Sequence, residues 1–382
     1  MILTRPSISP YLARTLAELG EPVVMVEEFP VPMRSALNLV PAASMDSGGE
    51  APILTSFENA LNYLYQALPN DDRVRKAQVF KDKAAFRRAI QGLFPEFFFR
   101  EVALDDLSNM DTASLQFPLV MKPSVGISSI GVYRVAAAQD WPKAVAFLKA
   151  ELSKYQSNYA SAVVESQNII LEEWISGVEL AIDGYFNSAG EPVILNILEH
   201  PFASDEDTSD RCYFTHRDLI RKYQGPLTGF LKRFGSLFEL RRFPFHLEVR
   251  CTPDGRILPI ELNPLRFAGL GTVELAEYAY GINVYRCFFR EEKPDWDRIL
   301  SSKDYSIYSF MCADVPTDLF RDPRLKIDDR KFFKIFEEVL EYRILSEAET
   351  STFAVIFYRS KDASENERLI RLDLRPYFSV EG

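Results

Sequence analysis

Two segments of the chain have the alternating pattern of β-strands. Residues 245–251 and 257–263 each alternate apolar and polar side chains. The Asp-Gly pair at 254–255 favours a two-residue hairpin turn between them, in which Pro253 faces Arg256. A turn of another length would shift the pairing, and this is the alternative to the prediction.

The predicted hairpin places two acids opposite each other. Glu248 faces Glu261, His246 faces Asn263, and all four side chains lie on one face. Two carboxylates at a Cβ separation of ~5 Å repel each other, so that one takes up a proton or a cation lies between them. Carboxylate and amide oxygens are ligands that suit Mg²⁺. We therefore predict that Glu248, Glu261 and Asn263 bind a metal.

A lysine at the end of another apolar segment precedes a loop of small residues. Residues 117–122 form a predicted strand ending in Lys122, and residues 132–135 form its predicted partner. Small residues let backbone N–H groups approach an anion closely, and the lysine adds positive charge. No Lys-Ser/Thr follows the glycines and a strand comes next, which excludes a Walker A loop and a dinucleotide fingerprint. The alternative is a flexible hairpin with a surface lysine. The small residues are Ser124, Gly126, Ser128, Ser129 and Gly131.

A further segment offers a place for a flat ring. The strand predicted at 169–172 runs into a connecting segment with apolar side chains and backbone donors and acceptors, as an adenine ring requires. Glu179 follows at a distance suited to ribose hydroxyls. The alternative is an acidic strand end in solvent. The residues of this segment are Glu172, Glu173, Trp174 and Ile175.

The other elements are expected from periodicity and from helix start and stop signals. Helices are predicted at 11–19, 57–68, 82–93, 141–154, 230–240 and 330–342, and strands at 23–26, 178–186, 193–198 and 353–358.

Composition excludes several classes of protein. A chain of 382 residues, 47% of them hydrophobic, is too long for one ordinary core, which favours two or three domains. The net charge of −11 makes nucleic acid an unexpected partner. The four cysteines form no CxxC pair, as is typical of reduced thiols in a cytoplasmic protein. Residues 1–20 lack a long apolar run and carry charged residues, so we expect no signal peptide there. No apolar run approaches ~18 residues, so we expect no membrane segment.

Taken in their order along the chain, these segments together resemble the ATP-grasp superfamily over roughly residues 80–290. The resemblance implies two lobes that clamp ATP, with Mg²⁺ ions (or Mn²⁺ as an alternative) bridging its phosphates. It implies that Lys83, Lys122 and the small-residue loop contact phosphates. It also implies adenine contacts from Glu172, Glu173, Trp174 and Ile175, ribose contacts from Glu179, and metal binding by Glu248, Glu261 and Asn263.

One motif departs from the family pattern. The usual ending Glu-x-Asn-x-Arg has its arginine one place later here, at Arg266. Arg266 is still expected to orient a carboxylate or an acyl phosphate. His246 and Arg250 extend the acidic strand face, and either is a candidate for contacting a γ-phosphate or a substrate acid.

The resemblance implies a mixed α/β (α+β) class built on the ATP-grasp fold. We expect an N-terminal α/β domain at 1–80 and an ATP-grasp domain at 81–295, with a mobile lid at about 117–172. A small α+β appendage is expected at 296–382.

The expected activity is an ATP-dependent ligation of a carboxylate to an amine, of amino-acid or peptide type, which releases ADP and phosphate. Small-molecule carboxylates and amines are the expected partners, and a homodimer is left open. The acidic loop at 199–216 is a candidate substrate-facing segment, although a solvated loop is the favoured alternative. The alternative functions are a small-molecule kinase of the same fold and a non-catalytic nucleotide-binding regulator.

Overall fold

A computed structural model describes most of the chain. It describes residues 1–5, 8–44, 51–126, 131–156, 168–204, 207–316, 319, 325–345 and 352–380. Among these residues, no helix combines the length and the apolar character needed to cross a membrane.

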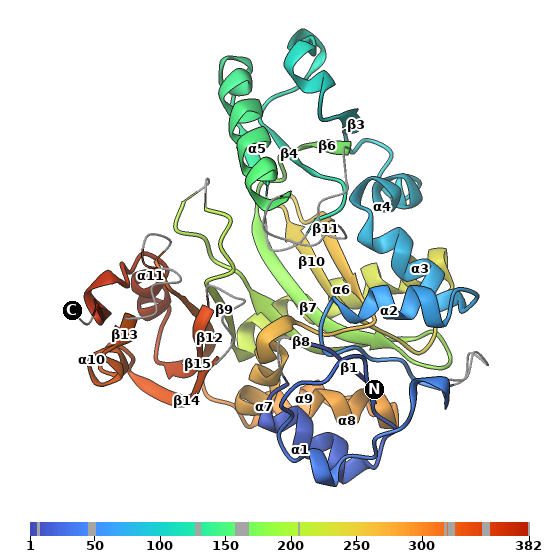
Figure 1. Cartoon of the computed structure of the whole chain (residues 1–382), viewed down its shortest axis with the longest axis vertical. Coiled ribbons are helices and arrows are strands. Elements are labelled where there is room, and N and C mark those ends of the chain that lie inside the picture. Colours follow the sequence, from blue (N-terminus) through green and yellow to red (C-terminus); the bar gives the residue numbers. More distant parts are fainter. Residues whose placement is uncertain are drawn as a thin grey trace.

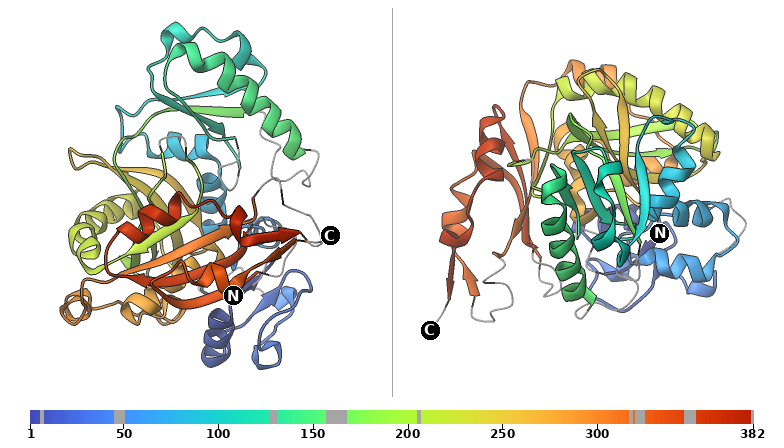
Figure 2. Two further views of the ribbon diagram at one scale, coloured as in Figure 1. Left: turned by 90° about the vertical axis from the view of Figure 1, so that its left-hand side faces the viewer. Right: turned by 90° about the horizontal axis from the view of Figure 1, so that it is seen from above.

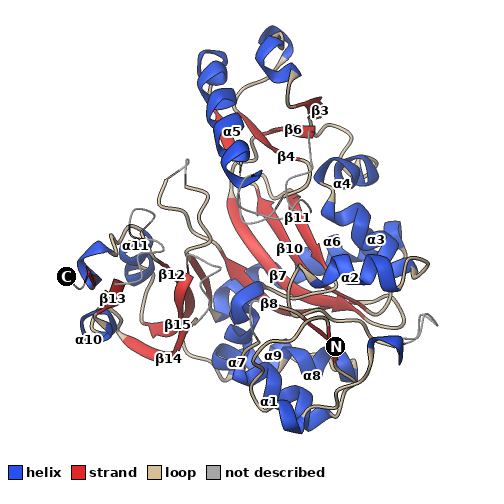
Figure 3. Cartoon of the chain, viewed as in Figure 1, coloured by secondary structure: helices blue, strands red, loops and turns tan. Residues whose placement is uncertain are grey.

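An eight-stranded antiparallel sheet forms the centre of the molecule (Figures 1 and 3). Its strand order is β11-β10-β7-β8-β9-β12-β15-β14. Helix α6 packs against β8, and its aromatic side chains join those of the sheet in the largest core cluster. The bounds are β7 Val178–Phe186, β8 Pro192–Glu199, β9 Cys212–Thr215, α6 Arg217–Phe238, β10 Phe243–Cys251, β11 Ile257–Pro264, β12 Ile307–Asp314, β14 Glu338–Ile344 and β15 Thr352–Ser360.

A smaller sheet lies above one end of the central sheet, in the upper part of Figure 1. Its order is β3-β6-β4-β5, and helix α5 covers one face. Buried side chains such as Met121, Trp141 and Leu171 give this lobe a core of its own, separate from that of the central sheet. The bounds are β3 Phe99–Ala103, β4 Leu119–Pro123, β5 Tyr133–Val135, α5 Trp141–Gln156 and β6 Asn168–Glu173.

The N-terminal part of the chain packs beneath the central sheet and shares its core. Helix α1 starts where the Ser9 side chain accepts a hydrogen bond from the Leu12 N–H, and it ends at Gly20, which confirms the helix predicted there. The bounds are β1 Ile2–Leu3, α1 Pro10–Leu19, β2 Val24–Met25, α2 Ala60–Ala67, α3 Asp72–Lys81 and α4 Lys83–Ile90.

The last 80 or so residues extend the central sheet by strands β12, β15 and β14, which Figure 2 shows beside the rest of the molecule. The helix predicted at 330–342 is wrong, because α10 ends at Phe333 and the edge strand β14 follows it. The domain boundaries given above stay a prediction. The remaining bounds are α7 Leu275–Tyr280, α8 Val284–Arg290, α9 Trp296–Ser301, β13 Leu325–Ile327, α10 Asp329–Phe333, α11 Ser364–Ile370 and β16 Phe378–Val380.

Candidate active site

The hairpin of β10 and β11 has the predicted register at the acids. Glu248 pairs with Glu261, and His246 pairs with Asn263. The turn is different from the prediction. The Thr252 N–H donates to the Arg256 carbonyl at 3.0 Å, which closes a three-residue loop.

Two features explain why the acids still meet. Gly255 has a φ of +85°, a conformation that glycine adopts without strain, and it ends the longer loop. The longer loop makes Cys251 pair with Ile257, one residue away from the predicted pairing. A register shift after Glu248 then restores the pairing of the acids.

Two lysines flank the acid pair because a single aspartate separates two helices. Asp82 ends α3 and caps α4, since its side chain accepts hydrogen bonds from the Ala84 and Ala85 N–H groups. Lys81 and Lys83 therefore stand on either side of the helix break, and both side chains are buried.

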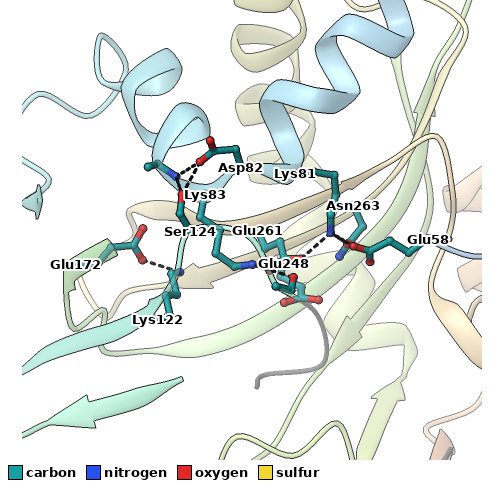
Figure 4. Close-up of polar contacts among 12 residues, drawn as sticks. Glu58, Lys81, Asp82, Lys83, Lys122, Ser124, Glu172, Glu248, Glu261 and Asn263 are labelled. Carbon is teal, nitrogen blue, oxygen red and sulfur yellow. Dashed lines mark hydrogen bonds and ion pairs between the residues drawn. The ribbon is translucent and has the colours of Figure 1, made fainter. Parts of the chain in front are cut away.

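Both ammonium groups reach Glu261, as Figure 4 shows. Lys83 Nζ lies 3.0 Å from one Glu261 oxygen, and Lys81 Nζ lies 3.5 Å from the other. Lys81 Nζ also donates to Asn263 Oδ1 at 3.2 Å and contacts Glu58 Oε1 at 2.6 Å. Two oxygens from β11 and one from the distant Glu58 thus surround one ammonium group.

The two opposed acids have different electrostatic environments. Burial disfavours the Glu261 carboxylate, but the adjacent lysines overcome this and lower the pKa of Glu261. Burial and the negative charge of Glu261 raise the pKa of Glu248. Extra positive charge near Glu248 would therefore be favourable.

A second cluster of charges lies under the small sheet. Lys122 Nζ contacts Glu172 Oε2 at 2.7 Å, and Arg87 Nε donates to Glu172 Oε1 at 2.5 Å. Burial opposes ionisation of Glu172, yet Arg87 and Lys122 lower its pKa to about 2. Burial also lowers the pKa of Lys122, although Glu172 acts in the opposite direction. The Glu172 carboxylate thus pairs with two cations at the cavity wall.

This cluster predicts a pH dependence of stability. Because folding lowers the pKa of Glu172 from 4.5 to about 2, its contribution is complete above pH 4.5 and declines as the pH falls towards 2. We expect Glu172→Gln to destabilise the protein at pH 7, by ~3 kcal/mol for the charge contribution. Urea unfolding should show the same difference in unfolding free energy between wild type and variant at pH 7 and pH 5, and a smaller difference at pH 4 and pH 3. A constant difference over the whole range would contradict the prediction.

The segment between β6 and β7 carries an indole ring that contacts two guanidinium groups. Arg250 and Arg134 lie 4.5 Å and 4.9 Å from the centre of the Trp174 ring. Arg250 also donates to the Ile175 carbonyl at 2.7 Å and to Glu179 Oε2 at 2.9 Å. Arg250 therefore fixes the segment for which we predicted adenine and ribose contacts.

Gly177 lets this segment approach β10. A Cβ atom at Gly177 would lie 2.2 Å from the Cys251 carbonyl oxygen, so any larger residue would force the two apart. On the other side of Glu179, His200 Nδ1 lies 3.2 Å from Glu179 Oε1, and its ring stacks on Tyr213.

A cavity lies between the small sheet and the β10–β11 hairpin, and it unites most of the predicted site. Arg87 and Arg134 line the cavity and were not predicted as site residues. The loop at 199–216, the candidate substrate-facing segment, contributes His200, Phe202, Asp207, Thr208 and Asp210 to the lining. The predicted residues that line it are Lys83, Lys122, Gly126, Glu172, Glu173, Trp174, Ile175, Glu179, Glu248, Arg250 and Glu261.

Some predicted residues are not in this lining. The Ser124 hydroxyl donates to Asp82 at 2.6 Å and so joins β4 to the helix break. Arg266 Nη2 contacts Glu58 Oε2 at 3.5 Å, and Asn263 accepts from Lys81. Ser128 and Ser129 lie outside the described residues, as do Asp205 and Glu206 of the acidic loop.

His246 is also outside the cavity lining and lies behind Glu248. Its Nδ1 is 3.0 Å from Asp183 Oδ1, and its Nε2 is 3.4 Å from Glu248 Oε1. Burial opposes the charged ring, but Asp183 and Glu248 raise the pKa of His246 to about 9. The sequence indicated neither Asp183 nor Glu58, because both meet the site through contacts between distant segments.

The donor set fits a hard divalent cation. Among the described residues, no group of three or more His, Cys, Asp or Glu side chains is arranged around a common metal position. The candidate set instead combines two carboxylates with the amide oxygen of Asn263, which is the oxygen chemistry that Mg²⁺ prefers. The raised pKa of Glu248 is consistent with a position that a cation would stabilise.

Comparison with known proteins agrees with this architecture. Residues 115–274 match a family model described as an ATP-grasp domain. The L-amino acid ligase from Bacillus licheniformis is 19% identical with a TM-score of 0.67, and the alignment covers 100% of this chain and 97% of that one. N5-carboxyaminoimidazole ribonucleotide synthetase from Thermotoga maritima is 14% identical with a TM-score of 0.63, covering 99% and 98%.

Biotin carboxylase from Campylobacter jejuni is 12% identical with a TM-score of 0.61, over 94% of this chain and 87% of that one. At these identities the solved structures establish similarity of fold. The resemblance and the mixed α/β class predicted from the sequence are confirmed.

Proposed function

The chain contains an ATP-grasp domain, and from this premise we propose that it is an ATP- and Mg²⁺-dependent ligase. In the proposed reaction a carboxylate is activated as an acyl phosphate and then attacked by an amine. The observation that carries the proposal is the opposed pair Glu248 and Glu261 in a cavity that also contains Lys83 and Lys122. Candidate metal ligands and candidate phosphate ligands thus face the same space.

Different parts of the cavity suit the different parts of a nucleoside triphosphate. Trp174 and Ile175 line it at the segment between β6 and β7, and Glu179 lines it at the start of β7, where an adenosine would lie. Lys83 and Lys122 line it nearer the acid pair, where they would contact the phosphates. This arrangement supports a nucleotide that extends from the indole ring towards Glu261.

Glu248, Glu261 and Asn263 would hold Mg²⁺, which supplies positive charge to the phosphate oxygens when bound. Glu261 already contacts two ammonium groups, so metal binding would replace part of these contacts. The lysines would then be available to phosphate oxygens, where they stabilise charge in the transferring group.

The proposed chemistry has two steps. An oxygen of the substrate carboxylate bonds to the γ-phosphorus of ATP, and the bond to ADP breaks. The amine nitrogen then bonds to the acyl carbon, phosphate leaves with the electrons of the C–O bond, and the nitrogen loses a proton. We assign Arg266 to orienting the carboxylate, because it already holds the carboxylate of Glu58. Arg250 is assigned to fixing the nucleotide segment.

The amino-acid type of substrate rests on similarity to a Bacillus L-amino acid ligase. A screen of amino acids and small carboxylates, alone and in pairs, would test both the reaction and the substrate class. We expect multiple turnovers of ADP and phosphate release only when a carboxylate and an amine are both present. A single acceptor that sustains ADP release and becomes phosphorylated would indicate a kinase. Binding of nucleotide without turnover for any pair would indicate a regulator, and either outcome would overturn the proposal.

A further inference from the structure

A buried row of three side chains runs away from the cavity behind Glu248. Asp183 on β7 pairs directly with His246 on β10, and their side chains meet at 3.0 Å. The other ring nitrogen of His246 lies 3.4 Å from Glu248 Oε1. Asp183 is 0% exposed and His246 is 5% exposed, so neither is open to solvent.

The same oxygen of Asp183 has a second partner. Asp183 Oδ1 also accepts a hydrogen bond from the Ala268 N–H at 2.8 Å. Ala268 lies two residues after Arg266, in the segment that leaves β11. One buried oxygen therefore fixes both the His246 ring and the backbone beside Arg266.

The geometry indicates why an imidazole stands between two acids. The ring has one carboxylate beside each of its two nitrogens, and an imidazole N–H is a donor that a carboxylate accepts. The ring then limits the orientations open to the Glu248 carboxylate. A buried polar row of this kind is also a poor source of stability, because well-packed apolar residues can often replace such groups without loss of stability. The arrangement is more readily explained by the position it gives to Glu248.

We propose that Asp183 and His246 are positioning residues that orient Glu248 for metal binding. The inference rests on the proposed function, because only that proposal makes Glu248 a metal ligand. It gives His246 a role different from the contact with a phosphate or substrate expected from the sequence. Replacing a residue that contacts and orients a metal-binding carboxylate commonly lowers metal affinity about 10–100-fold.

The test measures Mn²⁺ binding to the full chain by the electron paramagnetic resonance signal of free Mn²⁺. A saturating non-hydrolysable ATP analogue is present, and its own Mn²⁺ affinity is measured without protein. Asp183→Asn keeps the shape and an acceptor oxygen but removes the charge, and it should raise the Mn²⁺ dissociation constant about 10–100-fold. His246→Gln should have a similar effect. The double variant should lose little more than either single one, because the two residues act in one row.

Thr215→Val is the matched control, since Thr215 is 0% exposed in the same sheet and its hydroxyl bonds to Tyr280. This variant should change stability in urea without changing Mn²⁺ affinity. Glu261→Gln separates the two proposals. If it binds Mn²⁺ as tightly as wild type, the metal site and the proposed function are wrong. If it loses Mn²⁺ while folded Asp183→Asn and His246→Gln proteins stay within twofold of wild type, only the positioning proposal is overturned.

Discussion

Replacing Glu261 by glutamine is expected to reduce ligase turnover to less than about a tenth of wild type while the fold survives. The amide keeps the shape of the side chain but removes the negative charge that would bind the metal. A transition state stabilised by that metal should lose several kcal/mol, and each ~1.4 kcal/mol is tenfold in rate. ADP release with the best substrate pair is the measurement.

The same substitution leaves Lys81 and Lys83 without one of their anionic partners, so stability must be measured alongside. Urea unfolding and circular dichroism show whether the variant is folded under assay conditions. Glu338→Gln is the matched control, because it removes a surface carboxylate of the same sheet that pairs with Arg359. Full activity in a folded Glu261→Gln protein would contradict the metal assignment.

Replacing Lys122 by alanine is expected to weaken binding of ATP more than binding of AMP. The ammonium group lines the cavity and is among the charges that lower the pKa of Glu261, so it should act on the outer phosphates near the acid pair. A lost charge-assisted hydrogen bond of ~1.5–3 kcal/mol corresponds to roughly 10–100-fold in ATP affinity. Calorimetric titration with both nucleotides gives the comparison.

Lys143→Ala on the exposed side of α5 is the matched control and should change neither affinity. Equal losses for ATP and AMP in Lys122→Ala would assign the lysine a structural role instead. The basis of such a role would be the ion pair between Lys122 and Glu172. Arg87 remains with Glu172 in the variant and should keep that carboxylate in place.

The acid hairpin was predictable because its evidence is local. Alternation over two strands and an Asp-Gly turn were enough to put Glu248 opposite Glu261. The turn length was wrong by one residue, and a register shift between the acids and the turn compensated for the error. The same locality explains the correct prediction of Lys122 at a strand end, since β4 ends one residue later at Pro123.

Other features depended on neighbours that no short segment reveals. The charged stretch at 330–342 has helical spacing, but its second half pairs with β15 and becomes strand β14. Glu58 and Asp183 reach the site from segments far from the hairpin, so their neighbours in the sequence give no signal. Lys81 could have been identified from the sequence, because it directly precedes the capping residue Asp82, which is followed by the predicted Lys83.

The strand order of the central sheet has a consequence for synthesis of the protein on the ribosome. Strand β9 pairs with β8 through one residue pair, but with β12 through four. Arg211, at the start of β9, also donates to the carbonyls of Ile370 and Leu372. A nascent chain that ends before β12 can form the acid hairpin but lacks most of the partners of β9. The part of the cavity wall formed by His200, Phe202 and Asp210 should therefore become ordered only after the C-terminal strands emerge. A prematurely terminated chain would carry the acids without a complete cavity.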